Sequence, residues 1–398
     1  MRVTEASTQT QFLSNLDTLE SNIAQTQNQI STGLSYTLPS QNPAAAGAVD
    51  NFQQVLAQSQ QYTSNANSAQ TALNTEDTAL SQVQSNLQSL RSLALEANSG
   101  TVSAQNLSAI ATQAKQIQQS LLALANTQDG NGNYIFAGFA AQTQPFNQTA
   151  AGAGYAGDQG QRQIQIAAGQ TIPAGDSGDA VFNQIKTGNG TFTATAAATN
   201  TGTGVLGATT LSSPVTYAGA TYSIAFTSPT AYNITDSVTG AVTAGTYAPG
   251  QTISYGGVQV TLAGQPAAGD SFTVAPSTNQ SVFTTVQNLV NALQSASGSS
   301  SGQTPLNNSI ANALNNIDQA LANTSTVQTS VGGRLTAITT QLSVATSQQA
   351  QLTQSISSLQ GLNYAAAITS LDSQNTTLSA AMQAFTLTQG LTLFKYIG

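Results

Sequence analysis

A heptad pattern over residues 52–97 limits what this chain can fold into more than any other feature. Apolar residues recur there at alternating spacings of three and four, and Gln, Ser, Asn and Thr fill most positions between them. This spacing, held for about six heptads, predicts a helix with one seam for a partner helix. At 1.5 Å per residue the helix would be roughly 70 Å long, more than a compact domain needs. The seam positions are Phe52, Val55, Ser59, Tyr62, Ala66, Ala69, Leu73, Glu76, Leu80, Val83, Leu87, Leu90, Ala94 and Ala97.

Partners for such a helix are predicted at both ends of the chain. Residues 12–34 repeat the spacing and end before a linker that contains Pro39 and Pro43, which cannot lie inside a helix. Residues 103–128 follow the long helix after a short Gly-containing connection, so they are predicted to be its antiparallel neighbour. Residues 306–359 and 364–396 carry further seams, separated by a joint at Gly361.

The pattern changes between residues 143 and 280, where Gly, Thr, Ala and Ser dominate. Short alternating runs bounded by Gly turns predict a small antiparallel β domain inserted between the helices. Residues 191–203 look like a break with weak strand signals, which could divide the insert into two subdomains. Just before the insert, residues 134–139 are predicted to form one short strand. The predicted strands are 163–166, 221–226, 258–262 and 271–274.

Composition excludes several classes of function. The chain has no Cys and no His, which removes disulfides, thiolate metal sites and the commonest general base. Only 6% of residues are charged and the net charge is −8, which argues against a nucleic-acid partner. No run of about 18 apolar residues predicts a membrane span, and the first residues lack the apolar core of a cleavable signal peptide.

The motifs that could carry chemistry are weak. Residues 152–157 match G-x-G-x-x-G, but neither a strand before them nor a helix after them is predicted, so a loop is favoured over a dinucleotide site. Residues 129–133 open like a calcium loop but lack its later Gly and Glu. Glu76 falls on the seam, where a polar residue can fix register, and we favour that role over catalysis. We predict no catalytic, metal or cofactor-binding residues, and no enzyme.

The terminal segments are the predicted assembly surface. A helix of about 20 residues gains little stability alone, so these two could pair with each other or order when neighbouring subunits cover them. The predicted interface residues are Leu16, Leu19, Ile23 and Ile30 at one end, and Ile368, Leu371, Leu378, Met382 and Phe385 at the other.

Several motifs resemble the flagellin superfamily and, within it, the family of hook–filament junction proteins. Residues 131–138, with Tyr134, Ile135, Phe136 and Gly138, followed by 145–146, are similar to that family's "G-x-Y-I-F-A-G … P-F" run. Residues 30–33 resemble an "LSSG" stretch, and 39–44 resemble "PSDDPAGAA" with Gln41-Asn42 in place of two aspartates. The first four residues, 269–272 and 391–396 also fit. The resemblance covers roughly residues 1–185 and 255–398.

This resemblance implies a structural subunit of the bacterial flagellum, placed outside the cell between the other hook-associated junction protein and flagellin. Copies of the chain would form a thin annular layer. It also implies export through the flagellar type III apparatus without a cleaved signal, with an export chaperone, and no membrane or nucleic-acid partner. The fold would be mainly α, a long antiparallel heptad helical bundle formed by the N- and C-terminal regions with an inserted antiparallel β domain.

The predicted division follows from this fold. Segments 1–38 and 363–398 would be the terminal helices of the polymer core, 39–142 and 281–362 the helical rod, and 143–280 the outward-facing β domain. Two other readings stay open. Filament flagellin would share the fold, and a secreted adhesin would use the β insert for binding on a helical stalk.

Overall fold

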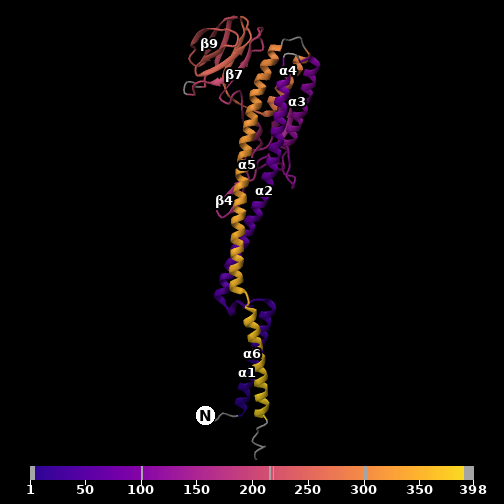
Figure 1. Cartoon of the computed structure of the whole chain (residues 1–398), viewed down its shortest axis with the longest axis vertical. Coiled ribbons are helices and arrows are strands. Elements are labelled where there is room, and N and C mark those ends of the chain that lie inside the picture. The colour runs from indigo at the N-terminus through magenta and orange to yellow at the C-terminus, as the bar shows by residue number, and fades with distance from the viewer. Residues whose placement is uncertain (1–4, 100–101, 215–216, 218, 299–302, 390–398) are drawn as a thin grey trace, which may run out of the picture. The chain divides into compact units, whose positions relative to one another are not determined.

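The computed structural model describes residues 5–99, 102–214, 217, 219–298 and 303–389 (Figure 1). The chain divides into two units, Met1–Ser64 with Gln341–Gly398, and Asn65–Thr340. The long helices α2 (Pro43–Ala97) and α5 (Gln303–Gln360) contribute residues to both units. The segments 1–4 and 391–396, which carry part of the family resemblance, lie outside the described residues.

In the first unit, helices α1 (Glu5–Thr32) and α6 (Tyr364–Gln389) lie side by side and antiparallel (Figure 1). The Phe12 and Phe385 rings stack with centroids 4.5 Å apart at one end of the pair. At the other end, Leu34 and Gly361 form an antiparallel backbone bridge. The two terminal segments therefore pair with each other, as the sequence allowed.

The linker between α1 and α2 contains a 3-10 helix, Pro39–Gln41, as the two prolines predict. Helix α2 begins at Pro43, a residue whose fixed φ suits the first helical position. The Asn42 carboxamide oxygen accepts a hydrogen bond from Ala45 N at 3.1 Å and caps that start. Within this unit, Gln349 Nε2 on α5 donates to the hydroxyls of Ser59 and Thr63 on α2.

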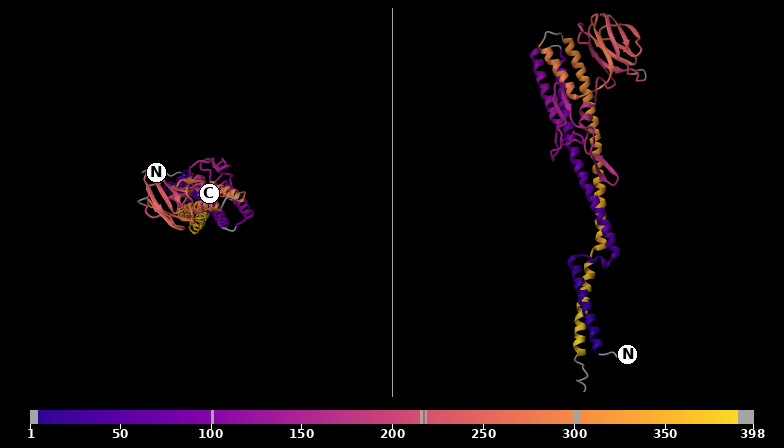
Figure 2. Two further views of the ribbon diagram at one scale, coloured as in Figure 1. Left: turned by 90° about the horizontal axis from the view of Figure 1, so that it is seen from above. Right: turned by 180° about the vertical axis from the view of Figure 1, so that it is seen from behind.

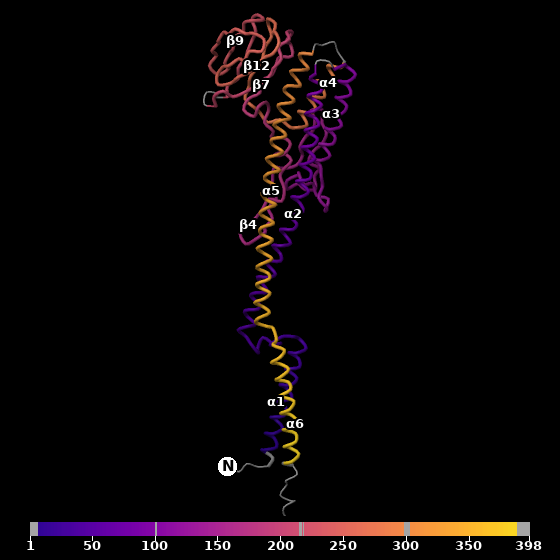
Figure 3. The backbone as a smooth tube through the Cα atoms, in the orientation of Figure 1, coloured from indigo at the N-terminus to yellow at the C-terminus, as the bar shows by residue number. Residues whose placement is uncertain are grey.

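In the second unit, α2 and α5 again run antiparallel, with Arg91 Nε 2.7 Å from Asp318 Oδ1. Helices α3 (Ala104–Ala125) and α4 (Val282–Gly298) pack beside them (Figure 3). The Gln118 amide of α3 donates to Phe283 O of α4 at 3.3 Å. The predicted seam of α2 is buried at every position from Ala66 to Ala97, because it faces these helices and the insert.

The β domain is a five-stranded and a three-stranded antiparallel sheet that share one apolar core (Figure 2). Their strand orders are β10-β9-β8-β13-β6 and β11-β12-β7. Asn308 of α5 fixes this domain, because its amide accepts from Leu206 N at 2.8 Å and donates to Gly204 O at 3.0 Å. The strands are β6 (Phe192–Ala196), β7 (Val205–Leu211), β8 (Tyr222–Ser228), β9 (Ala231–Asp236), β10 (Val242–Thr246), β11 (Thr252–Tyr255), β12 (Val258–Ala263) and β13 (Ser271–Pro276).

Three two-stranded hairpins or ladders connect this domain to the helices. They are β1 (Phe146–Thr149) with β2 (Gly152–Tyr155), β3 (Gln163–Ala167) with β4 (Gln170–Pro173), and β5 (Ile185–Lys186) with β14 (Asn279–Gln280). A short π-helix, Asp179–Asn183, lies between β4 and β5. The G-x-G-x-x-G match at 152–157 is thus mostly strand β2, with no helix after it.

The predicted fold class is confirmed, but three local predictions are wrong. Residues 134–139 form turns and one isolated bridge, because their backbone groups bond to other loops and not to a neighbouring strand. The break predicted at 191–203 contains β6, which pairs with β13 and joins the main sheet. Val55, a predicted seam position, is 40% exposed. The seam of α2 is continuously buried only from Ala66 onward, where other helices and the insert cover it.

The α2 seam supplies a stability test. Leu87 is fully buried on α2, so Leu87→Ala is expected to lower the free energy of unfolding by about 2–5 kcal/mol through lost burial and an internal cavity. Leu95 lies on the same helix and is 46% exposed. Leu95→Ala is therefore the matched control, with a change within about 0.5 kcal/mol. Denaturant unfolding measures both, and equal effects would contradict the assignment of the seam.

Candidate functional site

The predicted assembly residues of α1 all lie on the face that contacts α6. Ile23 is 8% exposed, and Leu16, Leu19 and Ile30 are half-buried. Thr26 belongs to the same stripe, and its hydroxyl donates to the Gln374 carboxamide of α6 at 3.2 Å. The heptad spacing of residues 12–34 thus describes a seam that is closed within the chain.

Helix α6 is different, because the predicted residues divide between two faces. Leu371, Leu378 and Phe385 are half-buried toward α1. Ile368 and Met382 are 49% and 53% exposed, and they lie beside the seam and not in it. The residues that complete the covered stripe are Ala367, Gln374 and Ala381.

A second apolar stripe therefore lies on the outside of the helix pair. It contains Ile368 and Met382 of α6, which are each about half exposed. Leu13 of α1, 47% exposed, is a further large apolar side chain that α6 does not cover. We call Ile368 and Met382 the outer stripe; Tyr364, one heptad before Leu371, continues the covered stripe, and its hydroxyl lies against Gly33. A helix with one covered and one uncovered stripe can pack against a helix of another subunit.

The family motif at 134–138 forms a buried loop in the second unit. Phe136 is fully buried, and its ring meets Phe182 edge-on with centroids 5.2 Å apart. Its carbonyl accepts hydrogen bonds from Gly178 N at 2.8 Å and from the Tyr155 hydroxyl at 3.1 Å. Tyr134 and Ile135 are half-buried, and their N–H groups donate to Ala141 O and Thr127 O respectively.

Gly138 is required by this loop. Its φ is +71°, in the left-handed region, and an added Cβ would overlap Asp158. The Asp158 carboxylate accepts hydrogen bonds from the N–H groups of Phe139, Ala140 and Gly160, and these bonds hold its pKa below the usual range. Sequence reasoning missed Asp158, because two of its partners, the N–H groups of Phe139 and Ala140, lie 19 and 18 residues away.

Phe139, the last residue of the short strand predicted at 134–139, lies in a turn and does not hold this region together. The side chain is 66% exposed, and its ring lies over Gly160, where a Cβ would overlap it. The aromatic residues that hold this region are instead the buried Phe146, Phe182 and Phe283. Burial also raises the pKa of Tyr155, beside Phe146, to about 12.

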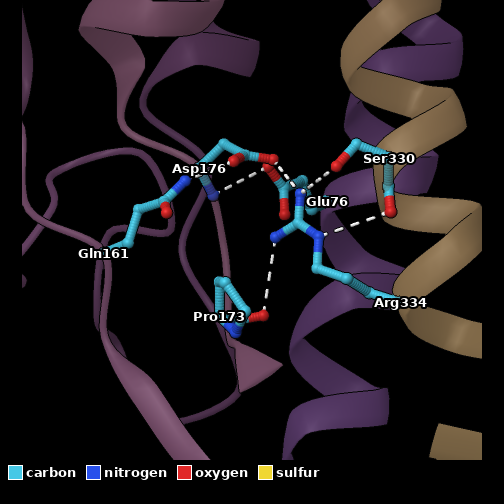
Figure 4. Close-up of polar contacts among 6 residues, drawn as sticks. All are labelled: Glu76, Gln161, Pro173, Asp176, Ser330 and Arg334. Carbon is cyan, nitrogen blue, oxygen red and sulfur yellow. Dashed lines mark hydrogen bonds and ion pairs between the residues drawn. The ribbon is translucent and has the colours of Figure 1, made fainter. Parts of the chain in front are cut away.

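A buried charge cluster joins α2, α5 and the segment after β4 (Figure 4). Arg334 of α5 forms an ion pair with Asp176, and both side chains are nearly buried. Glu76 of α2 is 1% exposed, and its Oε1 accepts a hydrogen bond from Asp176 N at 3.0 Å. Its other carboxyl oxygen, Oε2, is buried without a hydrogen-bond partner. Glu76 therefore contacts the insert, which its position on the seam did not predict.

The surroundings of Glu76 favour its neutral form. Desolvation by burial raises its pKa to about 8, and the Asp176 carboxylate adds to this, while Arg334 acts in the opposite direction. The cluster then contains one carboxylate and one guanidinium, which compensate each other. A Glu on a buried seam needs a compensating group nearby. Because the chain has only seven Lys and Arg residues, the position of Glu76 was a signal that pointed to a basic partner such as Arg334.

The described residues include no group of three or more carboxylates that could hold a metal ion. Nor does any helix in the described ranges combine the length and apolarity that a membrane crossing requires. The described residues instead form packing surfaces between helices, and on the terminal helix pair the outer stripe is left uncovered.

Comparison with known proteins finds relatives for much of this chain. Residues 3–141 match the family described as the bacterial flagellin N-terminal helical region. Flagellar hook-associated protein 3 of Salmonella typhimurium is 36% identical over 157 residues, which are 39% of this chain and 49% of that protein. This match thus spans about half the length of the curated relative. Crystallised FlgL of Xanthomonas campestris is 32% identical, with a TM-score of 0.72, over 77% of this chain and 99% of that one.

The chain belongs to the FlgL, or hook-associated protein 3, family. A FlgL of Legionella pneumophila, described as a flagellar junction protein, is 26% identical with a TM-score of 0.72, over 79% of this chain and 100% of that one. The resemblance drawn from residues 131–146 is thereby confirmed. Residues 194–276, much of which the resemblance did not cover, match a D2-like domain of flagellar hook-associated protein 1.

The two stripes of this FlgL-family chain are distinguished by a pair of substitutions. Phe385→Ala removes the ring that stacks on Phe12, so we expect the α1–α6 pair to lose about 1–2 kcal/mol and to open about 5–30 times more often. Met382→Ala, in the outer stripe, should change this opening by less than about twofold. Hydrogen exchange of α1 and α6 peptides measures both, and the reverse order would refute the assignment.

The two described ion pairs give a second matched comparison. The Arg334–Asp176 side chains are 12% and 13% exposed, whereas those of Arg91–Asp318 are 43% and 46% exposed. Arg334→Met leaves Asp176 buried without its cation and should cost about 3–5 kcal/mol. Arg91→Met should cost less than about 1 kcal/mol, because solvent screens that pair. Urea unfolding at pH 7 tests this, and a small effect of Arg334→Met would show that water reaches the cluster.

Proposed function

We propose that this chain is a structural subunit of the bacterial flagellum and acts as the hook–filament junction adaptor. The observation that carries the proposal is its likeness to FlgL of Xanthomonas campestris, 32% identical along 99% of that chain. The Legionella pneumophila FlgL described as a flagellar junction protein supports the same role. Like its relatives, the chain would be a building element and not an enzyme.

The terminal helix pair supplies the means of assembly. Its seam is closed by α1 and α6 themselves, while Ile368 and Met382 remain uncovered in the isolated chain. In the assembled layer, helices of neighbouring subunits would cover this outer stripe and remove its apolar surface from water. The seam residues Leu16, Leu19, Ile23, Ile30, Leu371, Leu378 and Phe385 would then hold the pair rigid, and Ile368 and Met382 would contact neighbours.

The partners in this proposal are the other hook-associated junction protein, flagellin, and copies of the chain in an annular layer. The segments 1–38 and 363–398 would enter the polymer core, the helical rod would comprise 39–142 and 281–362, and the domain 143–280 would face outward. The protein would leave the cell through the type III export apparatus, with a chaperone, and remain outside it in the flagellum.

Deletion of the gene tests the role directly. Electron microscopy should show hooks without filaments, and flagellin monomers should accumulate in the medium. The match to the flagellin N-terminal region would also suit filament flagellin. That alternative predicts loss of filaments without shed flagellin. Normal filaments would contradict both functions.

The outer stripe is tested in the deletion strain with a double variant. Ile368→Ser with Met382→Ser should leave α1–α6 pairing intact, because both side chains lie outside the seam. Cells that produce it should nevertheless carry at least about tenfold fewer filaments, since two buried apolar contacts per subunit are lost.

Val238→Ser is the matched control, because Val238 is 76% exposed in the β domain and belongs to the second unit. Cells with this variant should assemble filaments normally. Normal assembly with the double variant would show that the outer stripe is not a subunit contact.

A further inference from the structure

The charge cluster joins three segments that lie far apart in the sequence. Glu76 comes from α2, Arg334 from α5, and Asp176 from the segment that follows the β3–β4 hairpin (Figure 4). This segment, residues 161–178, contacts both long helices inside the second unit. A change in the charge of this cluster therefore changes how the β3–β4 hairpin is attached to α2 and α5.

The cluster contains one negative charge too many when both carboxyl groups are ionised. Arg334 is paired with Asp176, so Glu76 has no cation of its own. Its Oε2 is buried and accepts no hydrogen bond, a condition that an ionised carboxylate tolerates poorly. A proton on Glu76 restores neutrality.

No other charged group described here takes part. The neighbouring Asp77 of α2 instead accepts a hydrogen bond from Gln328 Nε2 of α5 at 3.0 Å. On the insert side, Asp179 is bonded to the amides of Gln159 and Gln184. Arg162, at the start of the hairpin, acts on Asp129. The charge balance thus rests on Glu76, Asp176 and Arg334.

Most polar contacts of the hairpin with the helices pass through this cluster. Asp176 N donates to Glu76, and an Arg334 Nη donates to Pro173 O at 3.5 Å. A separate contact lies further out, where Asn65 Nδ2 donates to Gln165 O at 2.9 Å. Ionisation of Glu76 would therefore first weaken the attachment of residues 173–178 to α2 and α5.

We infer that Glu76 is a proton-operated latch, whose neutral carboxyl holds residues 161–178 against α2 and α5 and whose ionisation releases them. Release exposes the cluster to water, which solvates the second carboxylate. The device gives the surface formed by the β3–β4 hairpin a dependence on the pH of the surrounding medium. It is independent of the function proposed above.

The direction with pH follows from linkage. Burial raises the pKa of Glu76 to about 8 in the closed state, against 4.5 when it is exposed. The closed state therefore binds more protons between these values, and its advantage falls as pH rises from about 4.5 to 8. Between pH 6 and pH 9 the opening constant is expected to rise by about 10- to 100-fold.

Hydrogen exchange of the full chain, with labelling times scaled to the intrinsic rate at each pH, tests the latch. Peptides from residues 161–178 should show this rise between pH 6 and pH 9, while peptides from β8 should not. In Glu76→Gln, which is neutral at both pH values and nearly the same shape, the change should be below about twofold.

Asp176→Asn provides an independent variant, because it frees Arg334 to pair with ionised Glu76. The rise between pH 6 and pH 9 should then fall to about the twofold change or less that is expected for Glu76→Gln. Equal protection of wild-type residues 161–178 at both pH values would overturn the proposal. So would the wild-type rise persisting in Glu76→Gln, or a parallel rise in β8, which would indicate global unfolding.

Discussion

The antiparallel pairing of α2 with α5 is the interaction on which the rest of the structure depends. The seam of α2 removes a long stripe of Leu, Val and Ala side chains from water, and this burial stabilises the packing of α2 against its neighbours. An apolar stripe alone would tolerate sliding by a heptad. Polar contacts between the two helices, such as Arg91 with Asp318 and Gln349 with Ser59, make only one register favourable.

The insert is attached to this pair mainly by neutral amide side chains. Asn308 and Asn316 of α5 bond to the backbone of the insert, and Asn126, which follows the last residue of α3, makes two bonds with Phe146. A carboxamide both donates and accepts, so one side chain can satisfy two buried backbone groups without burying a charge. Such contacts respond little to salt or pH. The buried carboxylates at Glu76 and Asp176 are for this reason the exception, and the natural place for a response to protons.

The terminal helices show how a small segment can serve two kinds of packing. One stripe of α6 is used by α1, which gives the pair a defined structure before assembly. The adjacent stripe, with Ile368 and Met382, is left for contacts between subunits. A surface already held in shape by an internal seam binds with less loss of conformational entropy than a disordered helix would. This arrangement agrees with the function proposed for a member of the FlgL family.

The sequence by itself determined the long helices, the proline linker, the joint at Gly361 and the strands β3, β8, β12 and β13 of the insert, because local periodicity and turn residues specify these elements. It also determined the α1 seam and the buried part of the α2 seam. Only the tertiary structure decided that residues 134–139 form a loop, since their partners lie elsewhere in the chain. On α6 two heptad stripes share Leu371, Leu378 and Phe385, and only contact with α1 shows which is covered. The partners of Glu76 lie 100 and more residues away, a distance over which periodicity carries no information.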